Sequence, residues 1–223
     1  MEVLAMKITK FPQSCLLIET KGKKILVDPG TLKYKNEYFE IWNKVDMILI
    51  THKHPDHCNT EVLERLNKEI PIYSTKEVLE ANKTLDISMV KENDVIELDT
   101  IKVEVVHAIH GYQPLLKGAK EIHENVGYII DDGDNRLYTT SDTICFKNEY
   151  KADILCVPVT GHGLTMSAFE AALYAKEVEA VLTIPIHMDN PAFPPDENFI
   201  KEMFEKYEVE YEILENDETI EIE

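Results

Sequence analysis

The sequence predicts an α/β fold of two mixed β-sheets that face each other, with helices on the outer faces. Short apolar segments typical of strands open the chain, and strands alternate with helical segments in its middle. The second half again runs from strands into alternating helices and strands, which predicts a second sheet. No repeat, low-complexity tract or Pro/Gly/Ser-rich linker interrupts the chain. We therefore expect one domain over residues 1–223, with two halves of about 1–115 and 116–223.

The first half is expected to begin with antiparallel strands and to continue with parallel ones. Lys21-Gly22-Lys23 has the composition of a turn between two of the opening strands. Strands and helices alternate after it, which is the βαβ order of parallel neighbours. The expected strands cover residues 3–9, 14–19, 24–27, 45–50, 70–74, 87–90, 95–98 and 101–109, and the expected helices cover residues 36–43, 59–67 and 75–82.

The second half is expected to begin with a hairpin, because Asp132-Gly133-Asp134-Asn135 has the composition of a tight turn. Ser167 is followed three residues later by Glu170, the spacing of a helix capping box. The expected strands cover residues 126–130, 136–140, 154–159 and 181–186, two acidic strands close the chain, and the expected helices cover residues 167–178 and 196–207.

The length and composition suit a compact acidic protein. The chain has 223 residues, of which 44% are hydrophobic, and this is sufficient for a large core. Lys+Arg number 23 against 42 Asp+Glu, so the formal net charge is −19. Such a surface repels phosphate backbones and anionic membranes, which disfavours nucleic acid as a partner. Divalent metal ions would make one site locally attractive to an anion all the same.

The cysteines and apolar runs predict a protein of the reducing cytoplasm. Cys15, Cys58, Cys145 and Cys156 form no CxxC pair, and the first residues lack the pattern of a signal peptide. The apolar runs are far shorter than the roughly 20 residues of a membrane span, so no membrane association is expected. Cys58 adjoins a histidine, but a small buried side chain is its expected role.

The strongest chemical signal is a run of three histidines and an aspartate directly after the apolar strand at residues 45–50. His52 and His54 are two residues apart, so in an extended backbone they point to the same side and can share one ion. Asp56 and His57 follow Pro55, which suits the first turn of a helix, so we expect them to hold a second ion. Imidazole nitrogen and carboxylate oxygen are ligands that zinc, manganese and iron(II) accept. The other interpretation, a polar loop that caps the helix, does not explain the spacing.

HxHxDH after an apolar strand resembles the first metal motif of the metallo-β-lactamase-fold hydrolases. Within that superfamily the chain is similar to the small metal-dependent hydrolases that include the L-ascorbate-6-phosphate lactonase type. The resemblance extends over nearly all of the sequence and implies an αββα sandwich, with the ligand loops at strand ends along one edge. It also implies that Asp28, at the end of the third strand, does not bind a metal itself but holds the loop that carries the ligands. Without the resemblance, Asp28 reads as an ordinary turn aspartate.

Two metal ions need about seven protein ligands, so about three ligands must come from outside the first motif. His107 and His110 end one strand on opposite faces, so we expect only one of them to be a ligand. His110 precedes Gly111 and matches the family's second motif. His107 is then expected either to support the ligands without binding a metal or to pack in the core. The resemblance implies that Asp142 bridges both ions, although Ser141 stands where the family usually has glycine. It also implies that His187, after an apolar strand, completes the second ion.

A glycine-rich loop around His162 follows the strand at residues 154–159. Gly161 and Gly163 make such a loop easy to approach, and related hydrolases have a similar turn ahead of an Ala-rich helix. His162 is therefore expected to contact substrate or donate a proton, with exposure to water as the other interpretation. His123 is assigned no role.

Two ions that share a water would lower its pKa towards 7 and supply hydroxide at neutral pH. Asp56 is expected to hold a metal and also to orient the attacking water or carry its proton, which makes it the catalytic residue. The predicted reaction is metal-assisted hydrolysis of a small ester or lactone, and the lactonase relatives suggest a phosphorylated form. The alternative is a phosphodiesterase of the same fold that acts on a small, lipid-derived or RNA substrate, and the acidic surface counts against RNA.

Two further classes are disfavoured. His54 and His57 are both present, which does not match the di-iron oxidoreductases of this fold, and the apparently complete ligand set argues against a module without metals. We expect zinc or manganese as the two divalent ions, with iron also compatible, because histidine and aspartate bind all three. The expected partner is a small-molecule substrate, and a homo-oligomer is left open.

Overall fold

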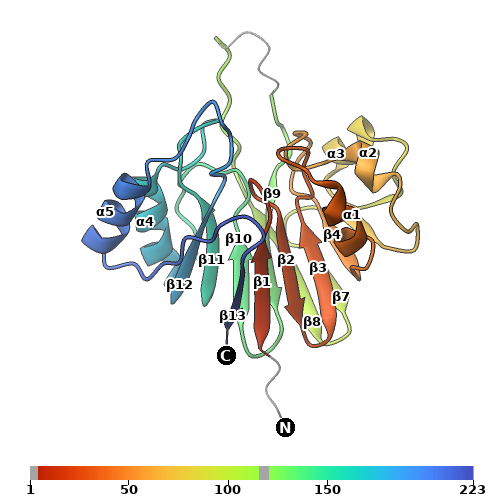
Figure 1. The fold of residues 1–223 in the computed structure, drawn as a ribbon, viewed down its shortest axis with the longest axis horizontal. Coiled ribbons are helices and arrows are strands. Elements are labelled where there is room, and N and C mark those ends of the chain that lie inside the picture. The colour runs from red at the N-terminus through yellow and green to blue at the C-terminus, as the bar shows by residue number, and fades with distance from the viewer. Residues whose placement is uncertain (1–4, 116–120, 223) are drawn as a thin grey trace. The chain divides into compact units, whose positions relative to one another are not determined.

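The computed structural model describes residues 5–115 and 121–222 (Figure 1). The chain forms two compact units, each with one β-sheet and its own helices. The first unit comprises Met1–Lys91 and Leu214–Glu223, and the second comprises Glu92–Ile213. Both sheets are mixed, which confirms the predicted class of two mixed sheets with flanking helices. None of the described helices combines the length and the apolar character that crossing a bilayer requires.

The sheet of the first unit has the strand order β13-β1-β2-β3-β4-β5-β6. From β13 through β1 and β2 to β3 each pair of neighbours is antiparallel, whereas from β3 through β4 and β5 to β6 each pair is parallel. The last strand of the chain lies beside the first one, as Figure 1 shows. The strands are β1 (Met6–Lys10), β2 (Leu16–Thr20), β3 (Lys23–Val27), β4 (Met47–Leu49), β5 (Ile72–Ser74), β6 (Ile87–Met89) and β13 (Thr219–Ile222).

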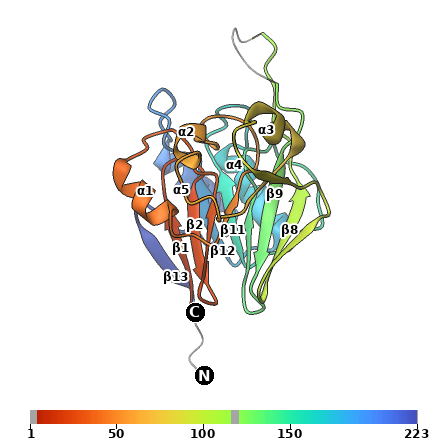
Figure 2. The same ribbon diagram turned by 90° about the vertical axis from the view of Figure 1, so that its right-hand side faces the viewer.

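The helices of the first unit are α1 (Asn36–Trp42), α2 (Thr60–Leu63) and α3 (Lys76–Ala81) (Figure 2). They bury Trp42, Val62 and Val78 in one core with alternate strand residues such as Leu26 and Ile48. Successive residues of a strand point to opposite faces, so this alternation brings one face of the sheet against the helices.

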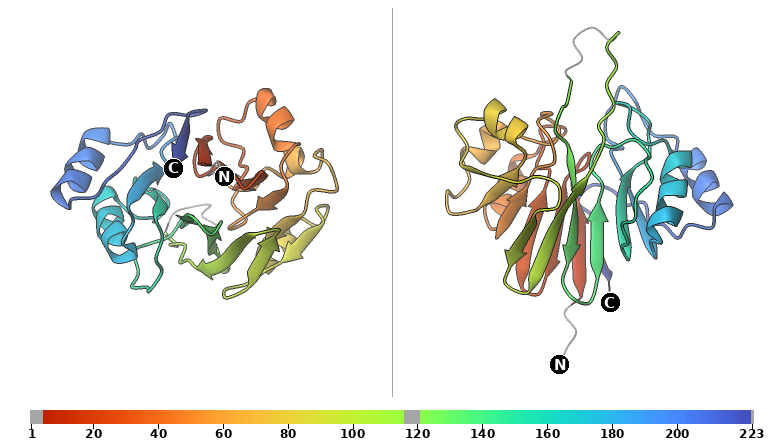
Figure 3. Two further views of the ribbon diagram at one scale, coloured as in Figure 1. Left: turned by 90° about the horizontal axis from the view of Figure 1, so that it is seen from below. Right: turned by 180° about the vertical axis from the view of Figure 1, so that it is seen from behind.

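The sheet of the second unit has the strand order β12-β11-β10-β9-β8-β7. The strands β7, β8, β9 and β10 are antiparallel, and β10, β11 and β12 run parallel. The helices α4 and α5 lie side by side (Figure 3). The elements are β7 (Val95–Leu98), β8 (Ile101–His107), β9 (Val126–Asp131), β10 (Arg136–Thr139), β11 (Ile154–Pro158), β12 (Leu182–Ile186), α4 (Ala168–Val178) and α5 (Glu197–Lys206).

The predicted hairpin and helix cap of the second unit are confirmed. The β9 and β10 strands pair antiparallel across the turn at residues 132–135. The capping box at the start of α4 is complete, because Ser167 accepts a bond from the backbone of Glu170 and the Glu170 side chain accepts one from the backbone of Ser167. The small side chains of α4, among them Ala171 and Ala175, let this helix pack closely on the β-sheet core.

Three predicted boundaries are wrong. The strand expected at residues 101–109 ends at His107, so His110 lies in a loop. The helix expected at residues 59–67 spans only Thr60–Leu63, because the chain then tightens into turns such as Arg65 N–H to the carbonyl of Val62. The first of the two expected closing strands is a single bridge between Thr183 and Tyr211, and only β13 forms a strand.

The two units divide the chain after Lys91 and after Ile213, not near residue 115. The β7 and β8 strands pair with β9, so residues 92–115 group with the second unit. The single domain over residues 1–223 stays a prediction.

Candidate metal centre

The predicted ligands form two clusters, one in each unit. The first cluster consists of His52, His54, Asp56 and His57, after β4. The second cluster consists of His110, Asp142 and His187, after β8, β10 and β12. The carboxyl ends of parallel strands meet at one edge of a sheet, which is where side chains from distant parts of the sequence can be gathered.

Asp28 anchors the first cluster. It directly follows β3, its backbone has a φ of 48°, and its carboxylate is fully buried. One oxygen accepts from the backbone N–H of Thr51 at 2.8 Å, and the other lies 2.8 Å from the Nδ1 atom of His57. Burial raises the pKa of Asp28, and the adjacent His57 opposes this shift. The resemblance implied this role for Asp28, and these contacts support it.

The hydrogen bond to Asp28 selects the tautomer of His57. Because the carboxylate accepts, Nδ1 of His57 carries the proton, and in the neutral ring Nε2 then presents a lone pair. Such support by a carboxylate is typical of metal-binding histidines. The Nε2 atom lies 3.9 Å from Oδ2 of Asp56. His57 and Asp56 therefore direct a nitrogen and an oxygen toward the same region.

His52 and His54 bring two nitrogens together as the sequence predicts. The Nε2 atom of His52 lies 3.2 Å from Nδ1 of His54, and the Nδ1 atom of His52 lies 3.1 Å from the hydroxyl of Thr51. Two nitrogens bound about 2.0–2.1 Å from one tetrahedral ion are themselves roughly 3.3 Å apart. The spacing in the structure therefore fits a pair of ligands for one ion.

The loop that carries Asp56 and His57 is a separate turn and not the first turn of a helix. The carbonyl of His54 accepts from the backbone of both His57 and Cys58, at 3.0 Å each. The α2 helix begins only at Thr60 and is capped by the side chain of Asn59. The expected helix start at Pro55 is therefore wrong, because residues 54–58 form a separate turn and the helix begins after it. Cys58 is buried as expected, and burial raises its pKa to about 11.

Two residues of the first unit that the sequence analysis missed hold Asp56. Gln13 is buried at a φ of 67° and donates from Nε2 to Oδ2 of Asp56 at 3.1 Å. Gly30 packs against the backbone of Asp56, and a Cβ at this position would lie 1.8 Å from the carbonyl oxygen. A lone glutamine before a strand carries no recognisable signal, whereas the sequence Asp28-Pro29-Gly30 has the composition of a turn and could have drawn attention to Gly30.

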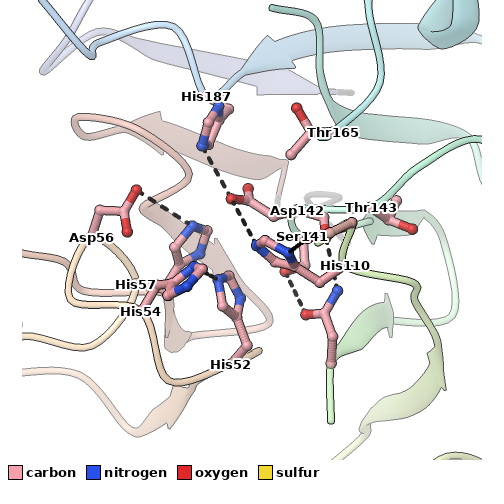
Figure 4. A network of polar contacts seen from close by, with 12 residues as sticks. His52, His54, Asp56, His57, His110, Ser141, Asp142, Thr143, Thr165 and His187 are labelled. Atoms are coloured by element: carbon pink, nitrogen blue, oxygen red, sulfur yellow. Dashed lines mark hydrogen bonds and ion pairs between the residues drawn. The ribbon is translucent and has the colours of Figure 1, made fainter. Parts of the chain in front are cut away.

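The second cluster is centred on Asp142. The Nε2 atom of His187 lies 3.1 Å from Oδ2 of Asp142, and the Nε2 atom of His110 lies 3.9 Å from the same oxygen. Nδ1 of His110 lies 2.7 Å from the carbonyl of Gly111, which can only accept, so Nε2 carries the lone pair. All three side chains are at most 5% exposed. Figure 4 shows both rings turned toward the carboxylate.

Asn125 and Ser141 hold the backbone at Asp142. Ser141 has a φ of 62°, a conformation that glycine adopts more easily, which explains why the related hydrolases usually have glycine here. The hydroxyl of Ser141 donates to Oδ1 of Asn125 at 3.1 Å, and Nδ2 of Asn125 donates to the carbonyl of Asp142 at 2.8 Å. Asn125 precedes β9, whose start pairs with the end of β8, so strand pairing brings it to the ligand loops.

The structure separates His107 from His110. The side chain of His107 is 45% exposed and its Nδ1 lies 3.0 Å from Glu92, while its ring contacts Phe146. The expectation that His107 packs in the core is therefore wrong, because the ring points out from the end of β8. His110 is the one of these two histidines whose ring lies near Asp142. That His107 supports the ligands without binding a metal stays a prediction.

His162 is held in place by three contacts. Its ring stacks on Phe193 with centroids 3.6 Å apart, and its Nε2 accepts from Nδ2 of Asn190 at 3.2 Å. Its centroid lies 6.1 Å from that of His187. His162 is therefore an ordered side chain beside the second cluster, and its contact with substrate stays a prediction.

The donors in both clusters fit divalent metal ions. They are imidazole nitrogens and carboxylate oxygens, which zinc, manganese and iron(II) accept, and two of the histidines are in the tautomer that presents Nε2. Figure 4 shows the first cluster with its three rings close to one another, and the His52 and His57 centroids are 4.0 Å apart. These His and Asp groups are candidate metal ligands.

Comparison with known proteins identifies the class. Residues 7–187 match the family described as Beta-lactamase superfamily domain. A UPF0173 metal-dependent hydrolase of Nanoarchaeum equitans is 27% identical over 97% of this chain and 100% of its own length. A UPF0173 protein of Pyrococcus abyssi is 31% identical over 89% of this chain and 90% of its own length. A metallo hydrolase of Ignicoccus hospitalis has a similar solved structure, with a TM-score of 0.78 and 24% identity over 98% of this chain and 99% of that one.

The fold and the ligand clusters together define a metal-dependent hydrolase with the metallo-β-lactamase fold. The chain belongs to the β-lactamase superfamily and, within it, to the UPF0173 proteins. The predicted fold class and enzyme class are thereby confirmed.

Proposed function

We propose that the two clusters act together and supply seven ligands to two divalent metal ions, zinc or manganese, with iron also compatible. The first cluster supplies four ligands and the second supplies three. Two ions need about this number once each has a shared water as a further ligand. The names of the UPF0173 relatives support metal dependence, and the number and identity of the ions are our proposal.

One observation carries this proposal: two histidines, one from each cluster, are held in the tautomer that a metal requires. His57 donates its Nδ1 proton to Asp28, and His110 donates its Nδ1 proton to the carbonyl of Gly111. Each ring therefore presents Nε2 as an acceptor before any ion binds. A histidine that served only to cap a helix would not need this support.

The proposed reaction is hydrolysis of a small ester or lactone. Divalent ions held by these residues would lower the pKa of water and polarise the carbonyl group, whose carbon the water attacks. Asp56 orients the attacking water or carries its proton, and Gln13 holds one of its oxygens by a bond of 3.1 Å. His162 contacts the substrate or donates a proton to the leaving group, and its stacking on Phe193 keeps it ordered for this role.

The sequence motifs, which resemble those of lactonase-type hydrolases, are the basis for proposing the ester or lactone class. The net charge of −19 disfavours RNA and anionic membranes as partners, so we propose a small-molecule substrate. A cytoplasmic location agrees with four free cysteines and stays part of the proposal.

The test is metal analysis of the purified protein together with hydrolysis of a small panel. The panel contains a sugar-phosphate lactone, an acyl-homoserine lactone and bis(p-nitrophenyl) phosphate. We expect two ions per chain, and we expect Asp142→Asn to lose both metal and activity. His123→Ala is the control, because this ring is 67% exposed and has no assigned role.

The outcomes separate the alternatives. Hydrolysis of either lactone supports the proposed reaction, whereas hydrolysis of the phosphodiester alone would replace it with phosphodiesterase activity. A protein that binds no metal after reconstitution with zinc or manganese would refute the proposed metal centre.

A further inference from the structure

Exposed apolar side chains lie on the loops of the second cluster and on the glycine-rich loop, and four of them are considered together. These side chains, the apolar rim, are Ile109, Ile144, Leu164 and Phe193, with exposed fractions of 36%, 37%, 39% and 50%. Single exposed apolar residues are common on proteins and do not indicate a function. Apolar residues that gather around ligand loops are different, because contiguous apolar surface marks a binding site.

Backbone contacts join three of these residues to the ligand loops. The backbone N–H of Ile144 donates to the carbonyl of Ile109 at 2.9 Å, which ties the Asp142 loop to the His110 loop. Gly111, next to His110, packs so closely on Leu164 that a Cβ at position 111 would lie 2.3 Å from the Cβ of Leu164. The three side chains are therefore placed by the same loops that place the ligands.

Leu164 also has an unusual backbone. Its φ is 61°, in the left-handed region that a leucine rarely adopts. A strained residue persists only where the surrounding structure holds it, and such residues gather at functional sites. Its packing against Gly111 holds Leu164 in this turn, and 39% of the residue is still exposed to solvent.

Phe193 is joined to the third ligand loop through His162. The two rings stack at 3.6 Å with an interplanar angle of 15°. Thr160 connects this pair to His187, because its hydroxyl donates to the His187 carbonyl at 3.3 Å and lies 3.4 Å from the backbone N–H of His162. The apolar rim is thus attached to the loops of all three ligands of the second cluster.

The described parts of the same loops contain no lysine or arginine, although Lys147 directly follows one of them. These parts are residues 108–115, 140–146, 160–166 and 187–195. A phosphate group on the substrate would therefore find apolar side chains and no cationic partner on these four described loops. An uncharged apolar group would instead remove the rim from water, at about 25 cal/mol for each Å² buried.

We propose that the apolar rim binds an uncharged acyl or alkyl substituent of the substrate, so that the enzyme prefers acylated esters or lactones to phosphorylated ones. This inference rests on the proposed function, because it concerns the same site. It differs from the phosphorylated form that the lactonase resemblance suggested, and that form stays the alternative that the experiment tests.

The experiment compares N-acyl-homoserine lactones with acyl chains of four to ten carbons, and a sugar-phosphate lactone, on the metal-loaded enzyme. We expect kcat/KM to rise about tenfold or more along the acyl series, because each added CH₂ that the rim partly removes from water favours binding. Leu164→Asn, which suits a left-handed backbone, and Phe193→Ser should flatten this rise. Phe169→Ser is the matched control, since Phe169 is 41% exposed on α4 and should leave the rise unchanged.

A second readout does not depend on catalysis. Calorimetry should detect binding of N-decanoyl-homoserine lactone to the metal-free protein, with a negative heat-capacity change that marks apolar burial. Phe193→Ser should weaken this binding, and Phe169→Ser should not. Equal kcat/KM for short and long chains, or preference for the sugar-phosphate lactone, would overturn the role of the rim and leave the hydrolase intact. Loss of all hydrolysis in the metal-loaded protein, with decanoyl binding retained, would instead refute the proposed function alone.

Discussion

Asp28 holds the ring of His57, a candidate metal ligand, through Nδ1. If asparagine replaces it, the amide oxygen must face the buried N–H of Thr51, so the amide NH₂ faces Nδ1 of His57. That arrangement forces the proton of His57 onto Nε2, where it blocks a metal. We expect Asp28→Asn to lower metal affinity about 10- to 100-fold, as measured by competition with a chelator.

The same substitution should cost the fold little. Burial raises the pKa of Asp28, so its charge is unfavourable in the folded protein, and a neutral amide of the same shape avoids this. We therefore expect the metal-free variant to unfold within a few degrees of the wild type. Asp46→Asn is the control, because Asp46 accepts a backbone bond from Lys24 and is not a ligand. Equal metal affinity in Asp28→Asn and wild type would show that Asp28 does not set the tautomer.

Asn125 is a positioning residue for Asp142, and Ser141 is its partner. Asn125→Ala removes both hydrogen bonds of the amide, so the loop should loosen and metal affinity should fall about tenfold. Ser141→Gly also loses one bond, but glycine relieves the backbone at a φ of 62° by up to about 1 kcal/mol. We expect it to keep metal affinity within about threefold, as measured by calorimetric titration.

The control for this pair is Asn148→Ala, which alters a loop asparagine with backbone contacts to Phe146 and Tyr150 in the same unit. It should leave metal affinity unchanged. If Asn125→Ala behaves like Asn148→Ala, the amide of Asn125 has no part in holding the ligand.

At the scale of elements, the loop after β3 supports the loop after β4. Thr31 N–H donates to the carbonyl of Pro55 at 2.9 Å, Asn59 N–H donates to that of Pro29 at 2.8 Å, and Gly30 fills the space between. Gly30→Ala would place a Cβ 1.8 Å from the carbonyl oxygen of Asp56, so the two loops must separate. We expect a loss of metal affinity and a lower melting temperature, measured by chelator competition and thermal unfolding.

Gly22→Asn is the control for this change. Gly22 has a φ of 75° with open space around it, and asparagine tolerates that conformation. It should retain metal affinity. Wild-type affinity in Gly30→Ala would mean that the packing of these two loops does not position Asp56.

At the scale of the whole molecule, stability should fall at alkaline pH. Burial raises the pKa of Tyr38 from 10.0 to about 12. The neutral phenol is favoured in the folded state, so its contribution is complete below pH 10 and is lost as the pH rises through 12. The net charge of −19 adds repulsion as further groups lose their protons.

Urea unfolding at pH 9, 10 and 11 measures this effect. The free energy of unfolding of Tyr38→Phe should fall less steeply with pH than that of the wild type. Other buried tyrosines, such as Tyr174, affect both proteins equally, so the difference isolates Tyr38. Tyr207→Phe should retain the wild-type slope. Identical slopes in wild type and Tyr38→Phe would contradict the assignment.

The sequence by itself predicted the class of fold, the candidate ligands and the close pair His52 and His54. These features depend on residues that are near one another in the chain, where the two-residue period of a strand and the chemistry of imidazole leave few arrangements. The capping box of Ser167 and Glu170 is of the same kind, because its geometry is contained in one turn of helix. Local spacing is sufficient for such predictions.

Only the tertiary structure decided which of His107 and His110 accompanies Asp142, and that Gln13 and Asn125 hold two of the carboxylate-bearing loops. Gln13 is 43 residues from Asp56, and Asn125 is 17 residues from the carbonyl it binds. Such contacts depend on which strands pair and where each strand ends. The sequence analysis placed the end of β8 two residues too late, at 109 and not at His107, and the position of His107 was wrong as a result. The physical reason is that strand pairing and loop closure bring together residues whose separation along the chain does not constrain them.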